Sequence, residues 1–135
     1  MLAYDGSEGA DRALEAGIEL AKIHGAELWA LGVEEGLPRF SATIDEVQEA
    51  KEFANQHFGK LLAAAKTRAG EAGVDLKTLL RPGHPAQTIV QVAREGKFDL
   101  ILVGHSGLSG VWAAFLGTTA EKVSRHAPCS VLIVR

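Results

Sequence analysis

The chain has 135 residues, enough for one domain that buries roughly 68% of its unfolded surface. Its net charge of −3, with dispersed Lys and Arg, excludes the basic footprint expected of a nucleic-acid-binding protein. No apolar run approaches the ~18 residues of a membrane span, and the single Cys129 excludes an internal disulfide or a multi-cysteine metal site. With no signal peptide before the first apolar segment, we expect a soluble cytoplasmic protein.

The first quarter of the chain predicts strand, helix and strand. Residues 1–4 are apolar and predict a short strand, and residues 5–7 predict a turn. A helix follows and ends at Gly25, with apolar positions at helical spacing: Ala10, Ala13, Leu14, Gly17, Ile18 and Ala21. Residues 27–33 then predict a second buried strand.

The middle of the chain predicts a loop, a long helix and an edge strand. Residues 34–42 are polar and contain glycine and proline, which is typical of a loop. Thr43 and Glu46 have the spacing of a capping box, which predicts a helix running to about Ala72. Residues 75–80 alternate more than the other strands and therefore fit a sheet edge.

The last third predicts two more helices and two more strands. Pro85 suits the first position of a helix, and residues 99–103 form an apolar run typical of a strand buried on both faces. A helix begins near Thr118 and stops before Pro128, and residues 130–134 predict a final strand at a sheet edge. The regular alternation predicts an α/β fold with an open five-stranded parallel sheet and helices on both faces.

A glycine-rich segment follows the strand at residues 99–103. Gly104 and Gly107 are followed, after nine residues, by Gly117 and two threonines that open the next helix. Glycines at the carboxyl end of a parallel strand let bare amides approach a phosphate, and a helix N-terminus attracts anions. The arrangement therefore predicts a nucleotide site.

On these residues the chain resembles a universal stress protein domain of the ATP-binding type. The motif G-x2-G-x9-G-[S/T] of that family is met in full, and the similarity extends to residues 3–7 and 126–134. The resemblance implies one domain over residues 1–135, a Rossmann-like, adenine nucleotide α-hydrolase-like fold with strand order 3-2-1-4-5, and a homodimer formed through Ser130 to Val134. Family members usually have a few residues before the first strand. The interpretation of this chain as a piece of a tandem or transporter-linked protein therefore stays open.

The resemblance also implies the ligand and its contacts. It implies bound ATP, with ADP and AMP left open, and Mg²⁺ held chiefly by the phosphates and water. Adenine and ribose contacts fall on Ala3, Asp5 and Val33. The full set of expected binding residues is Ala3, Tyr4, Asp5, Val33, Val103, Gly104, His105, Gly107, Gly117, Thr118, Thr119 and Ala120.

Several of these residues have a second interpretation. Asp5 could bind the nucleotide or merely cap the following helix together with Ser7. Thr118 and Thr119 could bind phosphate or act as helix N-caps. His105 and Ser106 occupy variable motif positions, so we expect a backbone contact and no catalytic histidine. Trp112 and Phe115 could cover the nucleotide, or belong to the core or a dimer contact.

The remaining chemistry-bearing side chains suggest no catalytic or metal site. We expect Cys129 to be a small core residue, and the other histidines (His24, His57, His84 and His126) lack metal-ligand spacing and are expected at the surface or at helix ends.

The leading hypothesis is an ATP-binding stress-response regulator with at most slow hydrolysis, because no base or arginine finger is evident. A nucleotide-free or AMP-sensing module is the alternative. An adenylating enzyme is disfavoured because residues 5–11 do not match S-G-G-x-D-S, and a dehydrogenase because no G-x-G-x-x-G follows the first strand. Glu34 only superficially resembles a ribose-binding acid.

Overall fold

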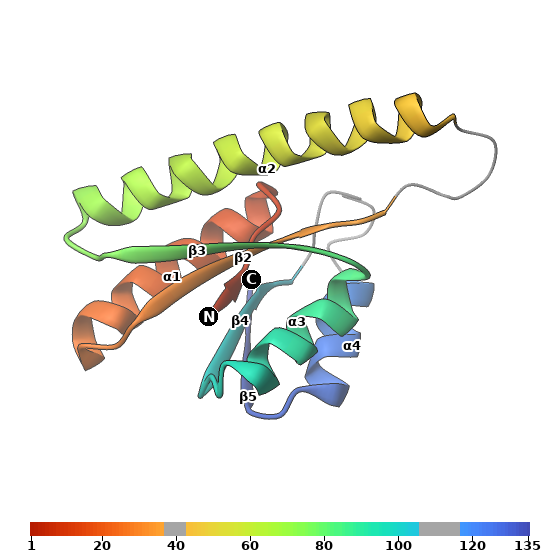
Figure 1. Cartoon of the computed structure of the whole chain (residues 1–135). Coiled ribbons are helices and arrows are strands. Elements are labelled where there is room, and N and C mark those ends of the chain that lie inside the picture. Colours follow the sequence, from red (N-terminus) through yellow and green to blue (C-terminus); the bar gives the residue numbers. More distant parts are fainter. Residues whose placement is uncertain (37–42, 106–116) are drawn as a thin grey trace.

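The computed structural model describes residues 1–36, 43–105 and 117–135 of the chain (Figure 1). Strands and helices alternate throughout this part of the chain, as the sequence predicts. In chain order the elements are β1 (Leu2–Ala3), α1 (Glu8–His24), β2 (Leu28–Glu34), α2 (Ile44–Glu71), β3 (Leu76–Pro82), α3 (Pro85–Glu95), β4 (Leu100–Gly104), α4 (Thr118–His126) and β5 (Ser130–Val134).

The described strands form one parallel sheet in the order β3-β2-β1-β4-β5. β1 lies at its centre, where Leu2 is in register with Ala30 of β2 on one side and with Leu102 of β4 on the other. The order reverses between β1 and β4, so the chain leaves these two strands toward opposite sides of the sheet. The predicted fold class, strand order and edge positions of β3 and β5 are confirmed.

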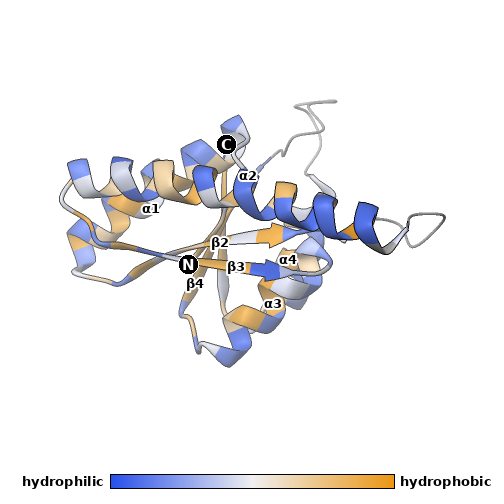
Figure 2. Cartoon of the chain, turned by 45° about the horizontal axis from the view of Figure 1, so that its top comes forward, coloured by the Kyte–Doolittle hydropathy of each residue, from blue (hydrophilic) through white to orange (hydrophobic). Residues whose placement is uncertain are grey.

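Each face of the sheet is covered by two helices, α1 and α2 on one side and α3 and α4 on the other (Figure 1). Strand residues alternate between the two layers: Leu28 and Ala30 pack with α1 and α2, whereas Leu31 packs with α3 and α4. Both faces are therefore apolar, which explains why β4 is a continuous apolar run without alternation. Figure 2 shows hydrophilic residues along much of α2, and its outer side faces solvent.

Local signals fix the helix ends. The Thr43 amide donates to Glu46 Oε2 (2.8 Å) and the Glu46 amide donates to Thr43 Oγ1 (3.4 Å), so the predicted capping box is present. α1 ends at Gly25, whose φ of 60° lies in the left-handed region that glycine adopts without strain. Strand bounds differ from the prediction by one or two residues: β2 and β3 extend one and two residues further, and β1 is one residue shorter at each end.

Replacement of Gly59 in the middle of α2 by alanine is expected to stabilise the protein by about 1 kcal/mol. A Cβ at Gly59 meets no atom within 4 Å, so the change only removes backbone freedom from the unfolded chain. Urea unfolding measures the gain. Gly6→Ala is the opposing control, because Gly6 has a φ of +78° and its Cβ would lie 2.8 Å from Leu61 Cδ2. Equal effects of the two substitutions would contradict these backbone environments.

Candidate functional site

A cavity of about 280 Å³ lies where the carboxyl ends of β1, β2 and β4 meet the N-terminus of α4. This is the point at which the strand order reverses, the usual ligand crevice of open α/β sheets. Ten of the residues expected to bind nucleotide line it: Ala3, Tyr4, Asp5, Val33, Val103, Gly104, Gly117, Thr118, Thr119 and Ala120. The structure therefore brings together residues that are more than a hundred positions apart in the sequence.

The turn between β1 and α1 forms one wall of the cavity. Asp5 Oδ1 accepts a hydrogen bond from the Ser7 amide (2.9 Å), and Ser7 Oγ accepts one from the Ala10 amide (3.2 Å). Ser7 is thus the N-cap of α1, and Asp5 holds the turn that places it there. Asp5 also lines the cavity, so its structural role does not exclude contact with a ligand.

Tyr4 connects this wall to the outer helices. Its hydroxyl donates to Asp11 Oδ1 (2.7 Å), and the same oxygen accepts from Arg68 Nη1 of α2 (2.7 Å). Burial of the ring, followed by the bond to Asp11, raises the pKa of Tyr4 to about 12. The neutral phenol is therefore the form that the fold stabilises.

The raised pKa of Tyr4 predicts a loss of stability at alkaline pH. The folded protein keeps this proton between pH 10 and about 12 while the unfolded chain loses it, so the contribution is complete below pH 10 and falls as pH rises through this window, by about 3 kcal/mol at most. Tyr4→Phe removes this part of the pH dependence. Because Tyr4 is the single tyrosine of the chain, tyrosinate absorbance follows it directly. A midpoint near 10 in the folded protein would contradict the prediction.

The N-terminus of α4 forms the opposite wall. Gly117 is its N-cap, with φ −58° and ψ 145°, and no described side chain caps this end. Of the two interpretations of Thr118 and Thr119, the one as N-caps is wrong, since both lie within the helix. The first hydrogen bond of the helix runs from the Glu121 amide to the Gly117 carbonyl, so the amides before it have no acceptor within the helix. These amides and the positive end of the helix dipole favour an anion here.

The structure requires glycine at position 104 for packing, whereas the sequence suggests that glycine is there to let a phosphate approach. A Cβ at this position would lie 2.5 to 2.8 Å from the backbone atoms of Gly9 in α1. The absent side chain therefore permits close packing of α1 on β4, and does not by itself show that a phosphate approaches Gly104. Its backbone still borders the cavity.

The charges around the cavity are unevenly distributed. Asp5 and Glu35 line the side formed by β1 and β2, and none of the described lining residues is Lys or Arg. Glu35 lies 3.6 Å from His84 Nδ1, across from the start of α3. The sequence pointed weakly to Glu34, but β2 extends through Glu34 and it is the next residue that lines the cavity.

Sequence reasoning missed several other lining residues. Ser7, Ala10 and Leu31 were assigned to the turn, helix and core, and Pro85 and Ile89 come from α3, which had no expected contact with the site. Only the predicted position of Pro85 at the start of a helix, confirmed in the structure, could have indicated that a second helix N-terminus borders the crevice.

Two expected binding residues do not line the described cavity. His105 is buried; its amide donates to the Val134 carbonyl (2.7 Å) and its carbonyl accepts from the Gly117 amide (2.9 Å). It therefore holds β4, β5 and the start of α4 together. Gly107, like Ser106, Trp112 and Phe115, lies outside the described residues.

The other histidines and Cys129 lie in the environments that the sequence predicts. The four other histidines are exposed, and Cys129 packs against the core beneath α3 and α4, where burial raises the pKa of its thiol. Within the described ranges, no group of three or more His, Cys, Asp or Glu side chains could hold a metal ion. A search of the same residues found no helix with the length and apolarity needed to cross a membrane.

The open parallel sheet and the crevice at its switch point define a nucleotide-binding class of α/β fold. The sequence matches the universal stress protein family over residues 1–135, and the chain belongs to this family. Universal stress protein YxiE of Bacillus subtilis (strain 168) is 36% identical over 143 aligned residues, which cover 100% of this chain and 97% of that protein.

Solved structures agree with this assignment. Universal stress protein UspA from Lactobacillus plantarum matches with a TM-score of 0.89 and 27% identity, covering 99% of this chain and 95% of that one. A universal stress protein crystallised in complex with cAMP matches with a TM-score of 0.74 and 26% identity, covering 99% and 95%. The chain has the adenine nucleotide α-hydrolase fold of these proteins.

Proposed function

We propose that the crevice binds an adenine nucleotide, with ATP as the physiological ligand, and that binding regulates a stress response through partner contacts. The observation that carries the proposal is the N-terminus of α4, which has no side-chain cap and lines the cavity through Gly117 and the hydroxyl-bearing Thr118 and Thr119. A related universal stress protein has been crystallised with cAMP, which supports an adenine nucleotide. A volume of about 280 Å³ is close to the lower end of ligand pockets, ~300 Å³.

The charges orient the ligand. A phosphate is disfavoured beside the carboxylates of Asp5 and Glu35, and is favoured at the N-terminus of α4. Carboxylates accept hydrogen bonds from ribose hydroxyls and from the adenine amino group. Adenine and ribose therefore lie near Ala3, Asp5 and Val33, and the phosphates lie near Gly104 and Gly117 to Ala120, with Gly107 contributing backbone groups.

The proposed role is regulatory rather than catalytic. None of the described lining residues is a cation positioned to stabilise phosphoryl transfer, and Mg²⁺ would be held chiefly by the phosphates and water. Hydrolysis is accordingly expected to be slow. We place this activity in a single cytoplasmic domain over residues 1–135.

Titration calorimetry tests the proposal. Nucleotide-stripped protein is titrated with ATP, ADP, AMP and cAMP, each with and without Mg²⁺, and phosphate release is followed in parallel. We expect binding of adenine nucleotides, tightest for ATP, and far less than one turnover per second. Absence of binding by all four would favour the nucleotide-free alternative, and rapid turnover would overturn the regulatory assignment.

We also propose that β5 pairs with its counterpart in a second copy to form a homodimer. β5 has only β4 as a neighbour among the described strands, so its outer edge presents unpaired backbone groups, and Leu132 is 39% exposed on it. Leu132→Lys is expected to shift the protein toward monomer in light scattering, because it places a charge at the pairing edge. A dimer of unchanged strength would contradict this interface.

A further inference from the structure

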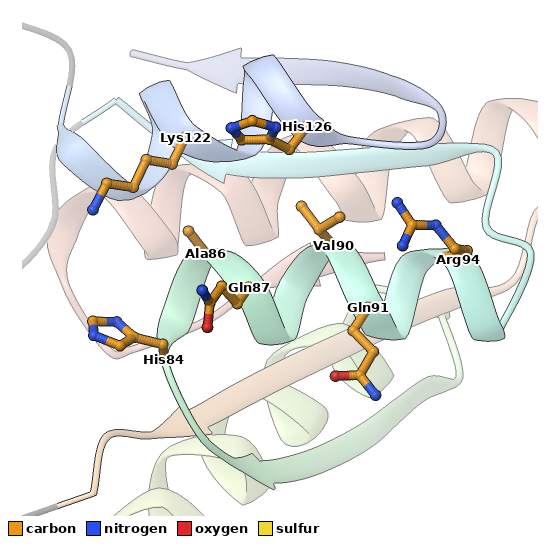
Figure 3. Close-up of a pocket in the computed structure, with 8 residues that line it drawn as sticks. All are labelled: His84, Ala86, Gln87, Val90, Gln91, Arg94, Lys122 and His126. Atoms are coloured by element: carbon orange, nitrogen blue, oxygen red, sulfur yellow. The ribbon is translucent and has the colours of Figure 1, made fainter.

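A second and larger cavity, of about 520 Å³, lies between α3 and α4. Its lining residues from α3 recur at helical spacing, and two from α4 are one turn apart. The full lining is His84, Ala86, Gln87, Val90, Gln91, Arg94, Lys122 and His126 (Figure 3). We call it the α3/α4 groove. None of these residues lines the nucleotide crevice, so the two cavities have separate walls.

The groove is lined by cationic side chains although the chain as a whole is acidic. Arg94 and Lys122 carry positive charge, and no acid is among the described lining residues. Neither Arg94, Lys122 nor His126 forms an ion pair with any described residue. A cationic cavity of this size is suited to an anionic ligand.

The acids on the two helices each bond a side chain of their own helix. Glu95 of α3 accepts a hydrogen bond from Gln91 Nε2 (2.8 Å), and Glu121 of α4 is paired with Arg125 Nη2 (2.9 Å). Glu35 reaches His84 from β2 at 3.6 Å, outside hydrogen-bonding distance. Neutralisation of Arg94 and Lys122 is therefore left to a ligand or to solvent ions.

The positions of the charges define the shape of the ligand. Figure 3 shows His84 and Lys122 toward one end of the groove and Arg94 toward the other, with Ala86, Gln87, Val90 and His126 between them. Val90 is only 9% exposed, so the floor is apolar. We infer that the α3/α4 groove binds a small organic anion with phosphate or carboxylate groups at both ends.

Calorimetry on the whole chain tests the inference, with fructose bisphosphate and adipate as probes and inorganic phosphate as the singly anionic comparison. Each titration is run with and without saturating AMP, so that it remains interpretable if the nucleotide proposal fails. We expect at least one two-ended probe to bind more tightly than inorganic phosphate and without displacing AMP. The better probe then distinguishes a phosphate from a carboxylate ligand.

Matched variants show whether the binding is at the groove. Arg94→Gln and Lys122→Gln are each expected to weaken the preferred probe about tenfold or more. Lys22→Gln, an equal charge change on α1 outside the groove, is expected to leave it unchanged. All three side chains are exposed, and unchanged thermal melting verifies the fold. No binding of either probe, competition with AMP, or equal effects of the three variants would overturn the inference.

Discussion

Thr118→Asp is expected to weaken ATP binding by about 100-fold while leaving the nucleotide-free protein as stable as the parent or slightly more so. Thr118 is the first residue of α4 after the N-cap Gly117, and it is exposed at the cavity. A carboxylate there interacts favourably with the helix dipole, by about 0.3–1 kcal/mol, but occupies the place proposed for phosphate with a like charge. The affinity for ATP should therefore fall while the stability of the nucleotide-free protein stays the same or rises slightly.

Thr118→Ser is the matched control, because it keeps the hydroxyl and adds no charge. Adenosine is the second control: it lacks phosphate, so its affinity should be nearly the same in Thr118→Asp and in the parent. Calorimetry gives the affinities, and thermal unfolding gives the stability. If Thr118→Asp bound ATP as tightly as the parent, the phosphates would have to lie elsewhere.

Gly104→Ala is expected to give the largest loss of stability among the substitutions considered, about 3 kcal/mol or more. The new methyl group would lie 2.5 to 2.8 Å from backbone atoms of Gly9, and backbone cannot move aside as the end of a flexible side chain can. α1 would have to separate from β4, which opens the core formed by Leu14 and Leu102.

Gly70→Ala, the same change in α2 where a Cβ meets nothing within 4 Å, serves as the matched control and should not destabilise the protein. Urea unfolding without nucleotide is the appropriate measurement, because it isolates packing from any ligand effect. A Gly104→Ala variant as stable as the parent would contradict the close approach of α1 to β4 and would return this glycine to a role in phosphate binding alone.

The topology follows from local signals in the sequence. Apolar runs such as residues 99–103 identify buried parallel strands, and the Thr43–Glu46 capping box and Pro85 mark helix starts that the structure confirms. Each of these signals acts within a few residues. For this reason the order of elements could be predicted from one sequence, and the strand order came from the resemblance to a family.

Features that depend on packing between distant segments could not be predicted. The role of Gly104 requires Gly9 to lie against it. Asp11, which accepts the hydrogen bond from Tyr4, also bonds Arg68, and this second bond forms only when α2 packs on α1. The position of Glu35 at the cavity depends on β2, which runs one residue further than its apolar pattern. The α3/α4 groove likewise exists only once two helices are placed side by side.

Amide NMR of the labelled protein, titrated separately with adenosine and with AMP, tests the central claim most directly. Both ligands should shift resonances around Ala3, Asp5 and Val33, whereas only AMP should shift the amides of Thr118, Thr119 and Ala120, because only AMP carries the phosphate that they are proposed to bind. Identical shifts from the two ligands at the start of α4, or no shifts at the crevice with either ligand, would contradict nucleotide binding at this site.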